Sequence, residues 1–417
     1  MTCVRPSSVS GSIAAPASKS VVQRLVALAV LTKGETRIAA GSLCDDVRAA
    51  LSVAAAMGAR VSREPGSLVL HGKGRPDPAR LDCGESGLSL RMFSAVAALA
   101  EGPSLLEARG SLCARPVAML EEPLRALGAR CSSRAGLPPV TVEGPLRGGE
   151  VALSGALTSQ FLTGLLVATP RAESSSVLHV ADLASTPYVD LTLSLVEQAG
   201  GRVVRDGYRR FEIAGGQEYR PRAWQAEGDW SGAAFPLVAG AVAGRVRVTG
   251  LSRESRQADV RVLQALSDAG ATVLEDEQGV TCARARLRGF TFDATDCPDL
   301  LPPLVALAAH CEGESVLGGS ARLRHKESDR VAALTAGFSA LGVEVADDGA
   351  ALRVRGGRVG GGRVASFGDH RIAMALAVAA LAGQGAVTIE GAGAISKSYE
   401  GFFDDLVALG AVVEEVP

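Results

Sequence analysis

Several features that would indicate a particular class of protein are scarce in this chain of 417 residues. Aromatic residues make up only 4% of it, too few for the stacking platforms that bind single-stranded nucleic acid. The formal net charge is −2, so the composition indicates no basic surface for nucleic acid or for an anionic membrane. We therefore expect no nucleic acid and no membrane among its partners.

Cysteine spacing gives no sign of a metal site or of disulfide bonds. The eight cysteines are scattered along the chain without a C-x-x-C pair. This spacing predicts neither a zinc site nor a disulfide framework. It favours a reducing compartment, and we expect the protein to be cytoplasmic.

Apolar runs long enough to cross a membrane are missing from the sequence as well. The longest run, 372–382, is far short of the roughly 18 to 20 residues that a spanning helix needs. Residues 25–31 resemble the apolar core of a signal peptide, but no clear cleavage site follows them and similar runs recur later in the chain. We interpret this segment as a helix.

Lysine is rare, and its few positions are informative. It occupies only positions 19, 33, 73, 326 and 397, and arginine fills the rest of the 43 basic positions. Where arginine is the default, a retained lysine marks a place where a compact, titratable ammonium matters. Lys33 and Lys73 each precede glycine in a turn, so Lys19, Lys326 and Lys397 are the candidates for a functional site.

The sequence does contain a sixfold internal repeat of about 70 residues. In each copy a helix-like run ends in glycine and a short strand follows; the glycines are Gly58, Gly128, Gly200, Gly270, Gly342 and Gly410. Each is predicted to follow a helix end in the left-handed backbone region. A second helix, rich in alanine and leucine on nearly all sides, precedes each of these segments and is expected to be buried.

The repeating unit is therefore two helices with several short strands. Because such a unit is long for a solenoid repeat, we expect two globular halves of three units each. The most plausible seam lies near 226–229, after a polar stretch.

Polar residues at the starts of the buried helices form a first set of candidates, because helix N-termini attract anions. They are Lys19, Ser20, Arg24, Gly84, Gly87, Arg91, Thr158, Ser159, Gln160, Asp229, Asp299, Asp369, His370 and Arg371. Helix capping explains the threonine, the serine at 159 and the aspartates equally well, and His370 lacks metal-ligand spacing. Arg24 and Arg91 lie within apolar helices, where an unpaired arginine is costly.

The stretch 324–330, R-H-K-E-S-D-R, is the densest group of charges. If the apolar-periodic run after it is a helix, Lys326, Glu327 and Arg330 share one face of its first turn. Such a group would hold an anion and move a proton beside it, although a solvated helix start is the alternative. With Arg115 and Lys397 added, the cations outnumber what one phosphate requires, so a site for two anionic small molecules fits better.

These residues and the motifs around them resemble those of the 3-phosphoshikimate 1-carboxyvinyltransferase family. The resemblance covers essentially the whole chain through ordered motifs: S-K-S-x-x-x-R (18–24), G-E-S-G-x-x-x-R (84–91), A-R-P (114–116), T-S-Q-F-L-T (158–163), S-T-P-Y-V-D (185–190), E-G-D (227–229), K-E-S-D-R (326–330), G-D-H-R (368–371) and S-K-S (396–398). Each motif is short, but the ordered set is highly specific.

The resemblance implies an α/β (α+β) enolpyruvyl-transferase fold of two domains, each made of three βαβαββ units that close over the substrates. Residues 16–226 would form the first domain, mainly on the shikimate-3-phosphate side. Residues 227–417 together with 1–15 would form the second domain and supply the acid and base and part of the phosphoenolpyruvate site. The implied reaction moves the enolpyruvyl group of phosphoenolpyruvate to the 5-hydroxyl of shikimate 3-phosphate, with no metal or organic cofactor. We expect a monomer.

The same resemblance implies roles for individual residues. The shikimate-3-phosphate contacts would be Lys19, Ser20, Arg24, Thr158, Ser159, Ser185, Asp299 and Lys326, with Tyr188 as a further candidate. The phosphoenolpyruvate contacts would be Lys19, Gly87, Arg115, Gln160, Arg330, Arg371 and Lys397. Asp299 is similar to the family's proton acceptor and Glu327 to its proton donor, and Lys19 is shared between the substrates. Two carboxylates in different environments suit an addition that needs both an acid and a base.

Three positions depart from the family pattern. Glu85 stands where many members have asparagine and Leu88 where many have threonine, beside the implied phosphoenolpyruvate pocket. Arg322 stands where an asparagine often contacts shikimate 3-phosphate.

Two other functions fit part of the pattern. UDP-N-acetylglucosamine 1-carboxyvinyltransferase shares the fold and the donor, but its reactive cysteine lies several residues before its R-P, whereas Cys113 precedes Arg115 by two. The second alternative is a non-catalytic, anion-binding repeat protein, which the presence of both Asp299 and Glu327 disfavours.

Overall fold

Within residues 1–416, six small sheets organise the fold, one for each sequence repeat. The structure, a computed structural model, describes residues 1–416. It divides into two compact units, one of residues 19–226 and one of residues 1–18 with those from 227 onward. The chain thus passes between the units after Ser18 and after Ala226, whereas the family resemblance predicts the first passage after residue 15.

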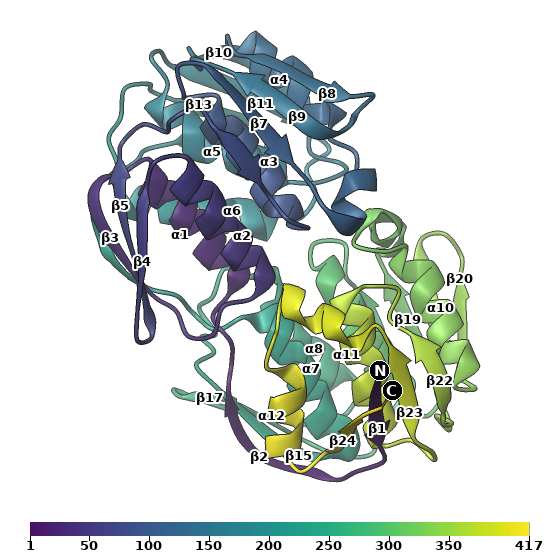
Figure 1. Ribbon diagram of the computed structural model, residues 1–417. Coiled ribbons are helices and arrows are strands. Elements are labelled where there is room, and N and C mark those ends of the chain that lie inside the picture. Colours follow the sequence, from purple (N-terminus) through teal and green to yellow (C-terminus); the bar gives the residue numbers. More distant parts are fainter. Residues whose placement is uncertain (417) are drawn as a thin grey trace. The chain divides into compact units, whose positions relative to one another are not determined.

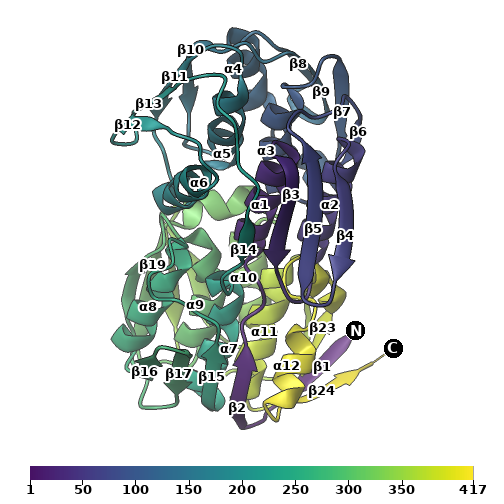
Figure 2. The same ribbon diagram turned by 90° about the vertical axis from the view of Figure 1, so that its left-hand side faces the viewer.

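The unit 19–226 contains three four-stranded sheets. Their strands, in spatial order, are β14 (Ala223–Gln225), β3 (Lys33–Ala39), β5 (Ser67–Lys73) and β4 (Arg60–Glu64); β6 (Arg80–Asp82), β7 (Pro103–Glu107), β9 (Leu137–Glu143) and β8 (Arg130–Arg134); and β10 (Gly149–Ser154), β11 (Ser176–Ala181), β13 (Arg210–Ile213) and β12 (Val204–Asp206). Its helices are α1 (Lys19–Val30), α2 (Asp45–Ala56), α3 (Gly87–Ala97), α4 (Glu121–Ala126), α5 (Gln160–Ala168) and α6 (Thr186–Gln198), with 3₁₀ turns η1 (Gly110–Ala114), η2 (Ala118–Leu120) and η3 (Thr169–Arg171). Figure 2 shows β3, β5 and β4 side by side with α1 and α2 packed on them.

The other unit repeats this plan. Its sheets are β2 (Val9–Ala14), β15 (Gly244–Thr249), β17 (Gly279–Ala283) and β16 (Thr272–Asp276); β18 (Thr291–Asp293), β19 (Glu314–Gly318), β21 (Ala351–Arg355) and β20 (Glu344–Asp347); and β22 (Gly362–Ala365), β23 (Val387–Glu390), β1 (Thr2–Arg5) and β24 (Val412–Glu415). Its helices are α7 (Trp230–Ala243), α8 (Val262–Asp268), α9 (Leu301–Ala308), α10 (Arg330–Ala340), α11 (His370–Leu381) and α12 (Phe402–Ala408), with 3₁₀ turns η4 (Ala258–Arg261), η5 (Pro298–Leu300), η6 (Ser320–His325) and η7 (Ala392–Lys397).

Every sheet has the same pairing. The first two strands are parallel and the remaining pairs are antiparallel. A helix joins the parallel strands in the pairs β6–β7, β10–β11, β18–β19 and β22–β23, whereas β3 and β15 pair with β14 and β2 from distant parts of the chain. Parallel neighbours need such a crossover, whereas antiparallel ones need only a turn. Three sheets include a strand from a distant part of the chain: β14 pairs with β3, β2 pairs with β15, and β1 lies between β23 and β24. In Figure 1 the two ends of the described chain, Met1 and Val416, accordingly lie where β1 pairs with β24, and the Met1 amino group donates to the Val416 carbonyl over 2.9 Å.

Two predictions about the repeat are confirmed. All six repeat glycines have positive φ, from +81° at Gly342 to +100° at Gly410. The first helix of each unit is largely buried, and every residue of α3, α7 and α11 is buried. α7, α9 and α11 contact one another in their unit, and α3 contacts α1 and α5 in the other. The residues that begin these central helices are therefore held on a rigid core.

The structure corrects the expected position of the 326–330 group. α10 begins at Arg330, so Lys326 and Glu327 precede the helix instead of sharing its first turn. The reason is a cap: the Asp329 carboxylate accepts a hydrogen bond from the Ala332 backbone N–H over 3.1 Å and starts the helix there.

The capping predictions are correct in part. Asp229 caps α7 and Asp369 caps α11 through backbone N–H groups of Gly232 and Arg371. Asp299 is not a cap; it lies inside η5, and its carboxylate is engaged by cations instead. Ser159 occupies the cap position of α5 without a side-chain cap bond, and Thr158 accepts from the Gln160 N–H instead.

Two smaller observations concern absences. All eight cysteines are free thiols, and only Cys113 is exposed. Within residues 1–416, no helix is long and apolar enough to cross a membrane, and no group of three His, Cys, Asp or Glu side chains is placed to hold a metal ion.

Candidate active site

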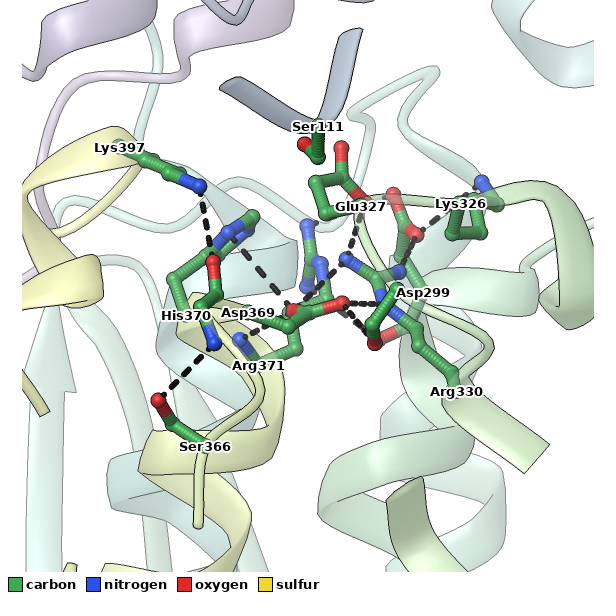
Figure 3. Close-up of polar contacts among 12 residues, drawn as sticks. Ser111, Asp299, Lys326, Glu327, Arg330, Ser366, Asp369, His370, Arg371 and Lys397 are labelled. Carbon is green, nitrogen blue, oxygen red and sulfur yellow. Dashed lines mark hydrogen bonds and ion pairs between the residues drawn. The ribbon is translucent and has the colours of Figure 1, made fainter. Parts of the chain in front are cut away.

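A buried arginine lies at the centre of the charged group in the unit that carries 227–416. Arg330, 1% exposed, contacts three carboxylates. Its Nε lies 2.8 Å from Asp369 Oδ2, its Nη1 lies 2.8 Å from Asp299 Oδ1 and its Nη2 lies 2.6 Å from Glu327 Oε2 (Figure 3). Burial by itself would lower the pKa of Arg330, but the charges of Asp369, Glu327 and Asp299 outweigh burial and raise it. The guanidinium therefore stays charged and fixes three acidic groups around it.

Asp299 is the second centre of this group. Besides Arg330, its carboxylate lies 3.3 Å from Lys326 Nζ and 3.3 Å from Arg371 Nη2. Arg371 also donates to the Asp299 carbonyl over 3.2 Å. Desolvation lowers the pKa of Lys326, although Asp299 opposes it. A carboxylate with three cations around it is stabilised in its ionised form, which is the form of a base.

Lys397 comes to the same part of the unit from a different element. It ends η7, and its Nζ donates to the Gly368 carbonyl over 2.8 Å, in the turn just before Asp369 and α11. Arg322 lies in η6 and donates to the Thr295 carbonyl over 3.2 Å; burial lowers its pKa, and Asp299 and Asp296 oppose this. Buried His370 stands next to Asp369, with Nδ1 3.9 Å from Asp369 Oδ1. The structure thus brings Asp299, Lys326, Glu327, Arg330 and Arg371 together, and holds Lys397 beside the α11 start.

The unit 19–226 holds a separate cationic group, with Arg24 at its centre. Arg24 is 3% exposed and donates to the Ser20 carbonyl over 2.7 Å and to Thr192 Oγ1 over 2.9 Å. Longer bonds reach Thr163 Oγ1 and the Tyr188 carbonyl. Burial lowers the pKa of Arg24 to about 10, so it remains protonated at neutral pH. These acceptors are neutral oxygens, so they leave its charge available for an anion.

Most of the other predicted residues of this unit lie at or near helix starts. Lys19 begins α1 and pairs with Asp46 of α2 over 2.8 Å. Ser185 occupies the N-cap position of α6 in a left-handed conformation, with φ of +58°, and makes no side-chain cap hydrogen bond. Arg91 of α3 donates to Gln160 Oε1 over 2.8 Å and to the Pro116 carbonyl over 3.0 Å.

Gly87 has a steric role at the start of α3. A Cβ at this position would lie 2.8 Å from Arg115 Nη1 and 2.9 Å from Arg91 Nη1. The absence of a side chain therefore lets two guanidinium groups approach the helix N-terminus, which itself favours anions.

Sequence reasoning missed several partners of these residues. Lys19 is oriented by Asp46, and Arg24 is oriented by Thr163 and Thr192. Asp369 forms an ion pair with Arg330 in addition to capping a helix. A buried arginine requires acceptors, so their existence was predictable. Their identity was not, because residues 24 and 192 are far apart in the chain.

Comparison with known proteins identifies the family to which this chain belongs. The model of the EPSP synthase (3-phosphoshikimate 1-carboxyvinyltransferase) family matches residues 4–406. A 3-phosphoshikimate 1-carboxyvinyltransferase of Aeropyrum pernix is 40% identical over 99% of this chain and 96% of the relative. One of Clostridium perfringens is 33% identical over 99% of this chain and 98% of the relative.

The fold is also shared. A solved structure of EPSP synthase from Acinetobacter baumannii superposes with a TM-score of 0.83 at 26% identity, covering 99% of each chain. The mixed α/β enolpyruvyl-transferase fold predicted from the sequence is thereby confirmed. The chain belongs to the EPSP synthase (3-phosphoshikimate 1-carboxyvinyltransferase) family.

Proposed function

We propose that this chain transfers the enolpyruvyl group of phosphoenolpyruvate to the 5-hydroxyl of shikimate 3-phosphate, giving 5-enolpyruvylshikimate 3-phosphate and phosphate. This reaction serves chorismate and aromatic amino acid biosynthesis. The family membership supports this proposal, and the main structural observation in its favour is the arrangement around Arg330. One buried guanidinium holds two carboxylates, Asp299 and Glu327, within 2.8 Å and 2.6 Å.

The unit 19–226 mainly binds shikimate 3-phosphate. Arg24 supplies a buried positive charge, and hydroxyl and N–H groups at helix starts supply donors that suit a phosphate. The residues we assign to this substrate are Lys19, Ser20, Arg24, Thr158, Ser159 and Ser185 of this unit, with Asp299 and Lys326 of the other. Tyr188 contributes its carbonyl to Arg24, which is an indirect role.

Phosphoenolpyruvate, with a phosphate and a carboxylate, requires more cations. We assign Lys19, Gly87, Arg115 and Gln160 of the unit 19–226 and Arg330, Arg371 and Lys397 of the other unit. Arginine suits both anionic groups because its planar guanidinium donates two parallel hydrogen bonds. The geometry at Gly87, where two guanidinium groups meet a helix start, supports this assignment.

The two carboxylates divide the proton transfers. Asp299, ionised among three cations, takes the proton of the 5-hydroxyl of shikimate 3-phosphate. The oxygen of that hydroxyl bonds to the central carbon of phosphoenolpyruvate in the same step. Glu327 in its protonated form gives a proton to the methylene carbon. The C–O bond to phosphate then breaks, and the new methyl group returns a proton to the Glu327 carboxylate, which restores the double bond and leaves phosphate as the second product. Such acid and base assistance typically contributes ~10²–10⁴-fold each.

Glu327 can gain a proton during the reaction because its ion-pair partner, Arg330, also interacts with the bound phosphate. A bound phosphate attracts Arg330, which weakens the ion pair between Arg330 and Glu327 and makes the carboxylate easier to protonate. The cations that bind the phosphate also stabilise it as the leaving group. The enzyme requires no further cofactor in this scheme, and we expect a cytoplasmic monomer.

The test is phosphate release from phosphoenolpyruvate and shikimate 3-phosphate by the purified protein. Asp299→Ala and Glu327→Ala should each lower the rate by at least about 100-fold. Asp293→Asn is the matched control, because this exposed carboxylate at the end of β18 accepts hydrogen bonds from the Thr295 hydroxyl and N–H and belongs to none of the proposed substrate contacts. UDP-N-acetylglucosamine as acceptor should give no release. Release with that acceptor, or folded protein inactive with both acceptors, would contradict the proposal.

A further inference from the structure

The segment that carries Arg115 is attached to the start of α3 by one carboxylate. Glu85 lies in the turn between β6 and α3. Its Oε2 accepts a hydrogen bond from the Ser111 backbone N–H over 3.0 Å and another from Ser111 Oγ over 3.0 Å. Ser111 is the second residue of η1, the 3₁₀ turn that ends at Ala114, directly before Arg115.

The backbone is shaped to allow this contact. Gly110, which begins η1, has φ of +51°, and a Cβ at this position would lie 2.3 Å from the Glu85 carboxyl carbon. Only glycine therefore permits the backbone to approach the carboxylate so closely. A neighbouring backbone bond, from the Arg109 N–H to the Gly84 carbonyl over 2.7 Å, joins the same two segments.

The far end of the segment is attached to α3 as well. Arg91 donates to the Pro116 carbonyl over 3.0 Å. Arg115 lies between these two attachments, is 8% exposed, and places its guanidinium against Gly87. Its own N–H donates to the Leu112 carbonyl inside η1. The position of the guanidinium thus depends on the position of η1, and η1 depends on Glu85.

We propose that Glu85 is a positioning residue for Arg115 in phosphoenolpyruvate binding. Its carboxylate accepts both Ser111 hydrogen bonds and thereby holds η1 so that Arg115 faces the α3 start. Charge-assisted acceptance makes this attachment stronger than a neutral one. Direct contact between Glu85 and a substrate is disfavoured, because both phosphate and carboxylate groups carry negative charge. The inference rests on the proposed role of Arg115 as a phosphoenolpyruvate contact.

The experiment is steady-state kinetics of the full chain with both substrates. Glu85→Ala should raise the KM for phosphoenolpyruvate about tenfold, with kcat changed less than about threefold and the KM for shikimate 3-phosphate unchanged. Ser111→Ala should have a smaller effect of the same kind, because the backbone donor remains. Glu85→Gln should be the mildest, since its amide oxygen still accepts. Glu101→Gln, which removes an exposed charge paired with Arg75, is the matched control and should behave as wild type.

A double-mutant cycle separates this inference from the proposed function. If Glu85 acts through Arg115, Glu85→Ala should add little to the KM change of Arg115→Ala. Fully additive effects, or equal increases in both KM values together with a large fall in melting temperature, would overturn the positioning role. If Arg115→Ala leaves the KM for phosphoenolpyruvate unchanged, the proposed role of Arg115 is wrong. If only Arg115→Ala raises it, Glu85 is not the positioning residue.

Discussion

Arg330 determines the geometry of one charged group through a single side chain. Its guanidinium bridges Asp369, Asp299 and Glu327. Each of its three nitrogens contacts a different carboxylate, so the arrangement depends on the planar shape of the group as well as on its charge. Lysine carries the same charge but cannot present the planar set of donors. The sequence motif K-E-S-D-R therefore contains the ion pair to Glu327, whereas the other two carboxylates come from distant segments.

Arg330→Lys should accordingly damage both stability and activity. Three buried or partly buried carboxylates would share one ammonium, and we expect a loss of about 2–4 kcal/mol in the free energy of unfolding and at least about a 100-fold fall in kcat/KM. Urea unfolding and phosphate release measure the two effects. The control Arg324→Lys affects only exposed ion pairs with Asp347 and Asp329 and should cost less than about 1 kcal/mol. Equal effects of the two changes would contradict the central role of Arg330.

Glu227 carries a pH-dependent cost for the folded state. Burial raises its pKa, opposed by hydrogen bonds from Ser255 and Gln257 and reinforced by Asp229. The folded protein therefore binds this proton more tightly than the unfolded chain. The resulting stabilisation is present below the unfolded pKa and is lost as the pH rises through the higher folded pKa.

Glu227→Gln should thus raise the melting temperature at pH values above the folded pKa, where the wild-type carboxylate is ionised at a cost. The advantage should shrink as the pH falls through the folded pKa and the wild-type group becomes protonated. Thermal unfolding at several pH values measures this difference. Glu277→Gln, at an exposed position, should show no such trend. A gain for Glu227→Gln that grows as the pH falls would contradict the argument.

At the level of elements, the repeat glycines end the second helix of each unit and start the next strand. The pattern was readable from sequence because an αL residue strongly favours glycine and because it recurs six times. The predicted start of α10 was wrong: Lys326 and Glu327 were expected in its first turn, but the helix begins after them because Asp329 caps it. Helix starts depend on which of several polar residues finds a backbone N–H, and that choice depends on local packing.

Gly342 allows the backbone effect to be isolated. It has φ of +81°, and nothing lies within 4 Å of a Cβ built there. Gly342→Ala should cost about 1 kcal/mol through backbone strain alone. Gly357 has equal space without a left-handed φ, so Gly357→Ala should be neutral or slightly stabilising. Urea denaturation compares the two, and identical values would show that the left-handed conformation carries no cost.

At the level of the whole molecule, the first strand completes a sheet made from the last part of the chain. β1 lies between β23 and β24, and Cys3 and Val4 are buried there. Deleting residues 1–6 should leave β24 without a partner strand and one edge of β23 unpaired, and should lower the melting temperature by more than about 10 °C or prevent folding. Arg5→Gln, which removes only the exposed ion pair with Glu414, is the control. A stable, active truncation would contradict this role of β1.

By itself, the sequence determined the sixfold repeat, the buried helices and the types of residue at their starts. These are properties of periodicity, glycine chemistry and charge, which act over a few residues. Only the tertiary structure decided which partners meet: Asp369 with Arg330, Thr192 with Arg24, Ser111 with Glu85. It also decided that β1, β2 and β14 complete sheets far from their own sequence neighbours. The physical reason is that a hydrogen bond or strand pair requires proximity in space, and local patterns do not encode the long-range folding that creates it.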